Sequence, residues 1–183
     1  MATATSRSDA AHTARMLFVV LALAAGFALV PRMTRGCGTA SGTEVAPDFT
    51  ADLIFNAPSA DQKQLTLSAL RGQPVILEFW ASWCQVCHSA APIINGVAQR
   101  FKDRGLVVVG IDTSDERILG ERTAAKKGLA FPIVYDKGNA IARDYHVDAL
   151  PTIIVLSKEG KIVAVRHGLT SESDLDRLVK QVL

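Results

Sequence analysis

Cysteine is scarce in this chain, which holds only three in 183 residues: Cys37, Cys84 and Cys87. Three is an odd number and too few for a small scaffold held together by disulfides, and it excludes a zinc site made of four cysteines. An excess of charge is also lacking in the main part of the chain. From Pro47 onward, 16 Lys and Arg balance 16 Asp and Glu, so the formal net charge of +2 arises entirely before that residue. The balance leaves no basic stripe of the kind that binds nucleic acid.

No apolar run is long enough to cross a bilayer of ordinary thickness without thinning the bilayer or snorkelling at its ends. The longest, Met16–Val30, has 15 residues without a charge, and such a helix reaches about 22 Å against a hydrocarbon thickness of roughly 30 Å. Because no clean cleavage signal follows it, the segment favours a signal-anchor in residues 1–30 over a cleaved signal peptide. Its terminal position and the Gly-, Thr- and Ser-rich stretch after it argue against a buried core helix. Residues 31–45 are predicted to be a linker. Cys37, within it, is interpreted as an incidental or intermolecularly pairing thiol rather than a lipid anchor.

Strand and helix patterns alternate in residues 46–183, which are predicted to form one α/β domain with a mixed sheet covered by helices on both faces. The expected strands are 53–55, 64–67, 75–80, 106–111, 131–135, 152–156 and 162–166, the first two forming an N-terminal β-hairpin extension. The expected helices are 84–103, 114–127, 139–145 and 171–183. Pro92 lies inside the first of these helices, and Ser114 is expected to cap the second.

The stretch Val75–Cys87 (VILEFWASWCQVC) combines a buried strand with two cysteines at the start of the helix that follows. Unpaired N–H groups and the positive end of a helix stabilise a thiolate at that position. Cys84 is therefore predicted to be the exposed attacking thiolate and Cys87 the resolving thiol one turn further on. A static disulfide or half of a metal site is the structural alternative.

Glu78 is the one acid in the otherwise apolar strand, six residues before Cys84. Burial would raise its pKa and suit it to relay protons to and from the thiols. The alternative is an edge position with the carboxylate in water.

His88 directly follows Cys87, so the sequence also spells C-x-x-C-H, the string that attaches c-type haem. A haem-binding electron carrier is thus one rival function. A copper-binding module using Cys84, Cys87 and a histidine is another, because soft thiolates suit Cu(I). The α/β pattern around the motif favours thiol chemistry over haem binding, and the copper-binding module remains the alternative.

The stretch FWASWCQVC resembles the active site of thioredoxins, with Glu78 where that family has a buried acid and Pro92 in its kinked helix. Leu150-Pro151-Thr152 is similar to the cis-proline loop that faces the cysteines there. The opening Ala46-Pro47-Asp48-Phe49, Asp112 and the long segment 113–145 look more like the TlpA/ResA branch of membrane-anchored thiol–disulfide oxidoreductases.

The resemblance implies a thioredoxin-like fold and an enzyme that exchanges its dithiol with disulfide-containing protein partners, with no cofactor or metal. It further implies that Trp83 and Pro151 shape the docking surface. The expected location is the periplasmic face of a bacterial inner membrane, held by the N-terminal segment. There the chain would act as a reductant fed by an upstream thiol donor, with cytochrome c maturation as one expected use.

Overall fold

The structure, a computed structural model, describes residues 44–183. The predicted signal-anchor, nearly all of the predicted linker and Cys37 lie outside the described residues. Within this range, no helix has the length and apolar character needed to cross a membrane.

Seven strands of the described chain form one mixed sheet in the order β2-β1-β5-β4-β3-β6-β7. Their bounds are Thr50–Phe55 (β1), Gln64–Thr66 (β2), Val75–Trp80 (β3), Val107–Asp112 (β4), Ile133–Tyr135 (β5), Thr152–Leu156 (β6) and Ile162–His167 (β7). The central strand β3 is parallel to β4 and antiparallel to β6. The predicted mixed sheet is confirmed.

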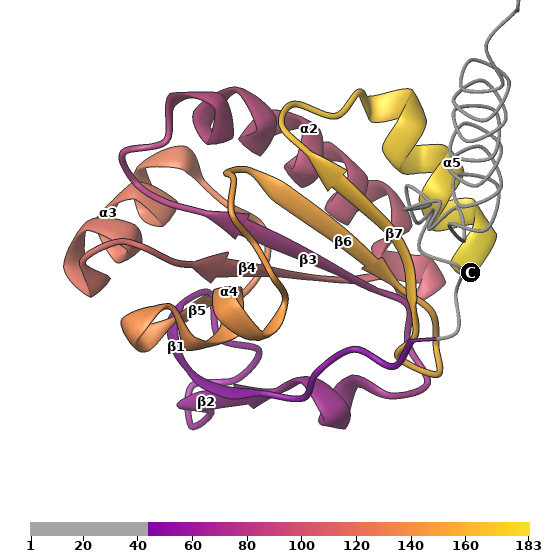
Figure 1. The fold of residues 1–183 in the computed structure, drawn as a ribbon, viewed down its shortest axis with the longest axis horizontal. Coiled ribbons are helices and arrows are strands. Elements are labelled where there is room, and N and C mark those ends of the chain that lie inside the picture. The colour runs from indigo at the N-terminus through magenta and orange to yellow at the C-terminus, as the bar shows by residue number, and fades with distance from the viewer. Residues whose placement is uncertain (1–43) are drawn as a thin grey trace, which may run out of the picture. The chain divides into compact units, whose positions relative to one another are not determined.

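Helices cover both faces of this sheet, as Figure 1 shows. They are Gln85–Phe101 (α2), Arg117–Lys127 (α3), Ala140–Asp144 (α4) and Glu172–Val182 (α5), with single 3₁₀ turns at Leu67–Leu70 (η1), Lys102–Arg104 (η2) and Lys137–Asn139 (η3). Side chains of α2, α3 and α5 pack into one apolar core, whereas those of α4 and η1 pack into another on the opposite face. The predicted helix layers on two faces are therefore also confirmed.

All six residues of β3 are buried, which is why its sequence is almost continuously apolar. Because side chains alternate along a strand, Ile76 and Trp80 enter the core under α2, while Leu77 and Phe79 enter the core under α4. Glu78 shares the α2 side with Ile76 and Trp80. The strand leads directly into the N-terminus of α2, so the only acid of β3 lies on the face that this helix covers.

Two details of the structure refine the expectations. Strands β1 and β2 pair antiparallel, and β1 also pairs with β5, so residues 50–66 form an edge of the main sheet. Helix α3 begins at Arg117 after Glu116, so the expected cap at Ser114 is wrong. Ser114 instead has a left-handed φ of 55°, and its N–H donates to Oδ1 of Asn139 at 2.7 Å. A contact across 25 residues, rather than the local helix, determines its conformation.

Candidate active site

Cys84 and Cys87 are joined by a disulfide, with their Cα atoms 5.2 Å apart. Cys84 is the N-cap of α2, and its Sγ accepts the backbone N–H of Cys87 at 3.1 Å. The helix thus begins one residue later than predicted. Only 5% of Cys84 and 3% of Cys87 are exposed, so the predicted exposure of Cys84 is wrong for the disulfide form. The reason is that both residues belong to the apolar core under α2.

The turn between β3 and α2 is held by polar contacts on several sides. The N–H of Ser82 donates to the carboxylate of Asp115, and the ring Nε2 of His88 lies 2.8 Å from the carbonyl oxygen of Ser82. The indole N–H of Trp83 donates to the carbonyl of Ser114 at 2.9 Å. Trp83 nevertheless remains 64% exposed beside the disulfide, which leaves its ring free to contact another molecule.

Glu78 is 2% exposed, which excludes the alternative of an edge carboxylate in water. Burial raises the pKa of this carboxyl to about 8, since the low-dielectric interior disfavours the charged form. At neutral pH the group is mostly protonated, and it can release or take up a proton close to that pH. This is the property that a proton relay beneath a pair of thiols requires.

Asp112, at the end of β4, is a second buried acid and pairs with Trp80 in the sheet register. It is 0% exposed, and neither carboxylate oxygen has a hydrogen-bond partner within residues 44–183. Burial is the main cause that raises the pKa of Asp112 to about 8, and the negative charges of the nearby Asp115 and Asp136 raise it further. The buried indole nitrogen of Trp80 likewise has no partner in the described chain. The α2 side of the sheet therefore carries two carboxyls that titrate near neutral pH.

Pro151 lies at the same end of the sheet as the cysteine turn. Its peptide bond with Leu150 is cis, as the resemblance implies. Phe79 pairs with Thr152 across β3 and β6, so the end of β3 and the start of β6 lie at the same end of the sheet. Leu150 packs against the core that contains both cysteines. The structure thus brings the predicted site residues Glu78, Cys84, Cys87 and Pro151 to one end of the sheet, with Trp83 on the surface there.

The groups that would hold haem or copper are engaged in other contacts. Both thiols are in the disulfide, and Nε2 of His88, the ring nitrogen that an axial ligand offers, lies against the carbonyl of Ser82. Across residues 44–183, no group of three or more His, Cys, Asp or Glu is arranged to hold a metal ion. No observation favours either rival function.

Several residues around the site carry no signal in the local sequence. Asp115 and Ser114 reach the cysteine turn from more than 30 residues away. His167 contacts Thr152 from the neighbouring strand β7. Only the register of the strands could have indicated that last pair, since Thr152 and His167 lie opposite one another.

Comparisons with known proteins agree with this geometry. The AhpC/TSA family model matches residues 43–165. The chain is 30% identical over 128 residues to the thiol-disulfide oxidoreductase ResA of Bacillus thuringiensis (strain Al Hakam), covering 70% of this chain and 74% of that protein. It is 29% identical over 157 residues to ResA of Bacillus subtilis (strain 168), covering 86% of this chain and 84% of that one.

Solved structures with the same fold include proteins described as acting on disulfides. A solution structure from Bacteroides thetaiotaomicron, assigned as a candidate protein disulfide isomerase, has a TM-score of 0.66 and 34% identity over 78% of this chain and 87% of its own. A crystal structure from Chlorobium tepidum, assigned as a candidate thiol:disulfide interchange protein DsbE, has a TM-score of 0.69 over 76% and 95% of the two chains. At 24% identity, the latter supports the fold alone. The chain therefore belongs to the AhpC/TSA family and, within it, to the thioredoxin-like thiol–disulfide oxidoreductases of the TlpA/ResA type.

Proposed function

We propose that this chain reduces disulfide bonds in other proteins outside the cytoplasm, using Cys84 and Cys87 as its dithiol. The observation that carries the proposal is the Cys84–Cys87 disulfide at the N-terminus of α2, directly after the buried strand β3. Two cysteines at this place can pass between dithiol and disulfide by exchange with a partner.

In the first step, the Cys84 thiolate attacks one sulfur of the target disulfide and releases the other sulfur as a thiol. In the second, Cys87 attacks Sγ of Cys84, which breaks the mixed disulfide and frees the second thiol of the target. Two electrons and two protons pass to the target, and the chain is left with its own disulfide. The Cys87 N–H that points at Sγ of Cys84 supports Cys84 as the attacking residue, because the same N–H stabilises its thiolate.

Glu78 is the proposed proton relay for the second step. Cys87 must lose a proton before it attacks, and both Cys87 and Glu78 are almost fully buried. A carboxyl with a pKa near 8, on the α2 side of β3, is suited to accept that proton and later return it.

Trp83 and Pro151 are proposed to form the docking surface for a disulfide-containing protein. Three apolar side chains at this end of the sheet are exposed: Trp83 at 64%, Val86 at 46% and Leu169 at 56%. Leu169 belongs to this surface because the preceding Gly168 donates its N–H to the carbonyl of Pro151 at 2.8 Å.

Each reduction of a target disulfide leaves the Cys84–Cys87 pair oxidised, so an upstream dithiol donor is also required.

The compartment and direction of transfer are proposed from the apolar segment 16–30 and the TlpA/ResA resemblance. We place the domain at the periplasmic face of an inner membrane, tethered by residues 1–30. There it would reduce selected disulfides in an oxidising compartment, including those formed during cytochrome c maturation. A reporter enzyme that works only outside the cytoplasm, fused after Leu183, should be active; an inactive fusion beside an active fusion to a known periplasmic protein would contradict the placement.

The reduction potential of the Cys84–Cys87 pair tests the direction. Equilibration of the purified chain with defined dithiothreitol or glutathione ratios should give a value near that of thioredoxin, roughly −270 mV. A value near that of DsbA, about −120 mV, would instead make the chain an oxidant.

A further inference from the structure

His88 is bonded to the turn that precedes Cys84. Its ring Nε2 lies 2.8 Å from the carbonyl oxygen of Ser82. A carbonyl oxygen only accepts hydrogen bonds, so Nε2 must carry the proton and donate it. Whether the ring is neutral or charged, this donor stays in place, because any further proton binds at Nδ1. His88 thus joins the first turn of α2 back to the segment from which the helix emerges.

The same turn is fixed on its other side by the loop between β4 and α3. Asp115 of this loop accepts the N–H of Ser82, and the carbonyl of Ser114 accepts the indole N–H of Trp83. The loop is itself tied down, since Oδ1 of Asn139 accepts the N–H of Ser114. His88 therefore supplies the contact from the helix side to a turn already held from the loop side.

A second histidine holds the cis-proline loop. The hydroxyl of Thr152, which is 0% exposed, donates to the carbonyl of Ala149 at 2.7 Å. Nδ1 of His167 lies 3.0 Å from the same hydroxyl oxygen. Because the hydroxyl has only one proton and it is used toward Ala149, Nδ1 must be the donor in the second bond. His167 thus holds the hydroxyl that joins the two ends of the segment containing Pro151.

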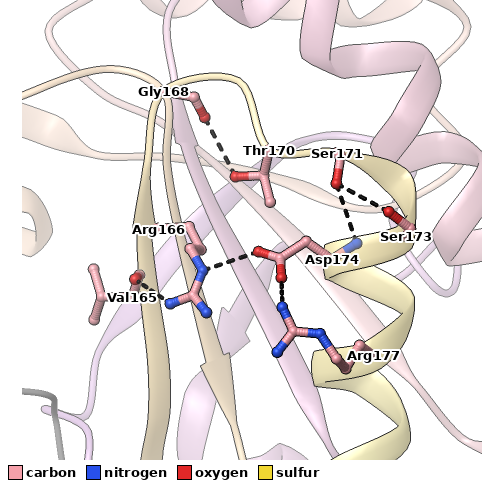
Figure 2. A network of polar contacts seen from close by, with 8 residues as sticks. All are labelled: Val165, Arg166, Gly168, Thr170, Ser171, Ser173, Asp174 and Arg177. Carbon is pink, nitrogen blue, oxygen red and sulfur yellow. Dashed lines mark hydrogen bonds and ion pairs between the residues drawn. The ribbon is translucent and has the colours of Figure 1, made fainter.

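The end of β7 that carries His167 is fixed in turn. Arg166 binds the carboxylate of Asp174 at 3.1 Å, Arg177 binds the same carboxylate, and Ser171 caps α5, as Figure 2 shows. On the other side of His167, the N–H of Gly168 donates to the carbonyl of Pro151. The histidine thus lies between two anchored neighbours on a strand that pairs with β6.

We propose that His88 and His167 are positioning residues for disulfide exchange: His88 holds the turn that presents Cys84, and His167 holds the cis-proline loop beside it. The two segments lie at the same end of the sheet, because Phe79 near the end of β3 pairs with Thr152 at the start of β6. The inference rests on the proposed function. It also gives the histidine of C-x-x-C-H a role in thiol chemistry.

The two histidines donate through different ring nitrogens, which allows a sharp test. A glutamine amide nitrogen occupies roughly the place of Nε2, and an asparagine amide nitrogen roughly that of Nδ1. His88→Gln and His167→Asn should thus keep the bonds, whereas His88→Asn and His167→Gln should lose them. His146, exposed after α4, provides matched control variants with both amides.

All six variants of the full chain would be measured in two assays: reduction of insulin in the presence of dithiothreitol, and reduction of the chain's own disulfide by dithiothreitol alone. Loss of one such hydrogen bond corresponds to a change of about threefold to tenfold. His88→Asn should lower kcat for insulin and the rate with dithiothreitol alone by that factor. His167→Gln should raise KM for insulin by a similar factor and leave the dithiothreitol rate unchanged. His88→Gln, His167→Asn and both His146 variants should remain within about twofold of the parent.

The inference is overturned if the asparagine and glutamine variants behave alike at both positions. It is also overturned if each loss of activity merely follows a lowered unfolding midpoint, measured for every variant, because that would indicate stability alone. If the parent chain does not reduce insulin but its own disulfide reacts with dithiothreitol, the proposed function fails. The His88 comparison then still decides the role of that residue.

Discussion

Gly120 of α3 lies directly against the carboxylate of Asp112: a Cβ at this glycine would be 1.9 Å from Oδ2 and 2.4 Å from Cγ. Asp112 is 0% exposed and its side chain is short, so it cannot move aside easily. Glycine is required here by the close approach of α3 to the end of β4.

Gly120→Ala should therefore lower the free energy of unfolding, by about 1–3 kcal/mol, although alanine favours helix. Urea unfolding measures the change. Gly96→Ala is the matched control, because a Cβ at Gly96 of α2 meets nothing within 4 Å; this variant should be neutral or stabilised by up to about 1 kcal/mol. Adding Asp112→Ala should remove most of the penalty at Gly120. Equal effects at the two glycines would contradict the contact.

The buried Glu78 should make stability depend on pH. Its pKa is about 8 in the folded chain against an ordinary 4.5. Between these values the folded state binds a proton that the unfolded state lacks, so the free energy of unfolding falls as pH rises. The contribution is complete below 4.5 and lost above about 8.

The glutamine side chain in Glu78→Gln cannot titrate, so this variant should lack the part of the pH dependence of unfolding free energy that Glu78 causes. The free energy of unfolding of the parent minus that of the variant should fall by about 1.4 kcal/mol per pH unit between pH 5 and 8. Urea unfolding at several pH values gives this difference. Asp112 is present in both proteins, so its contribution to the free energy of unfolding cancels in this difference. A difference that stays constant with pH would show that Glu78 does not titrate as a buried acid.

The same substitution tests the proton relay. If Glu78 accepts the proton of Cys87, Glu78→Gln should slow insulin reduction by about 10- to 100-fold and remove an inflection near the pKa of Glu78 from the pH–rate profile. The profile would be measured from pH 6 to 9, which spans the thiol pKa values. Identical rates for variant and parent throughout this range would rule out the relay.

Trp83 should act on partner binding rather than on the chemistry of the thiols. Trp83→Ala removes a largely exposed ring beside the disulfide and should raise KM for insulin about tenfold or more, since exposed tryptophans often dominate interfaces. The rate at which dithiothreitol reduces the chain should change much less. Ile118→Ala on α3, at a side chain of 47% exposure, is the control and should leave KM unchanged. An unchanged KM for Trp83→Ala would exclude this residue from the docking surface.

The elements predicted best from the sequence are those with a strong apolar pattern. The expected strands 75–80 and 152–156 coincide with β3 and β6 as observed. Both are buried along their whole length, so almost every residue contributes to the pattern. The C-x-x-C pair and Glu78 could be located for the same reason, because they lie within or directly after β3.

The hydrogen bonds that hold the cysteine turn could not be predicted, because they join segments that are distant in the sequence. The local pattern around Ser114 favours a helix cap, but its N–H bonds to Asn139 and its carbonyl to Trp83. Asp115 has no sequence feature that connects it with Ser82. The burial of Cys84 is likewise not predictable, because the sequence does not show that the first turn of α2 packs into the core.

The most direct test of thiol–disulfide exchange is to trap its covalent intermediate. Cys87→Ser removes the resolving thiol, so target proteins should remain disulfide-linked to Cys84. The variant would be made in the full chain together with Cys37→Ser, to exclude adducts through the third cysteine, and cell extracts would be separated on non-reducing gels. We predict adducts that dithiothreitol releases, and none when Cys84→Ser is added. If no adducts form, or if they persist without Cys84, the chain does not act by the proposed exchange.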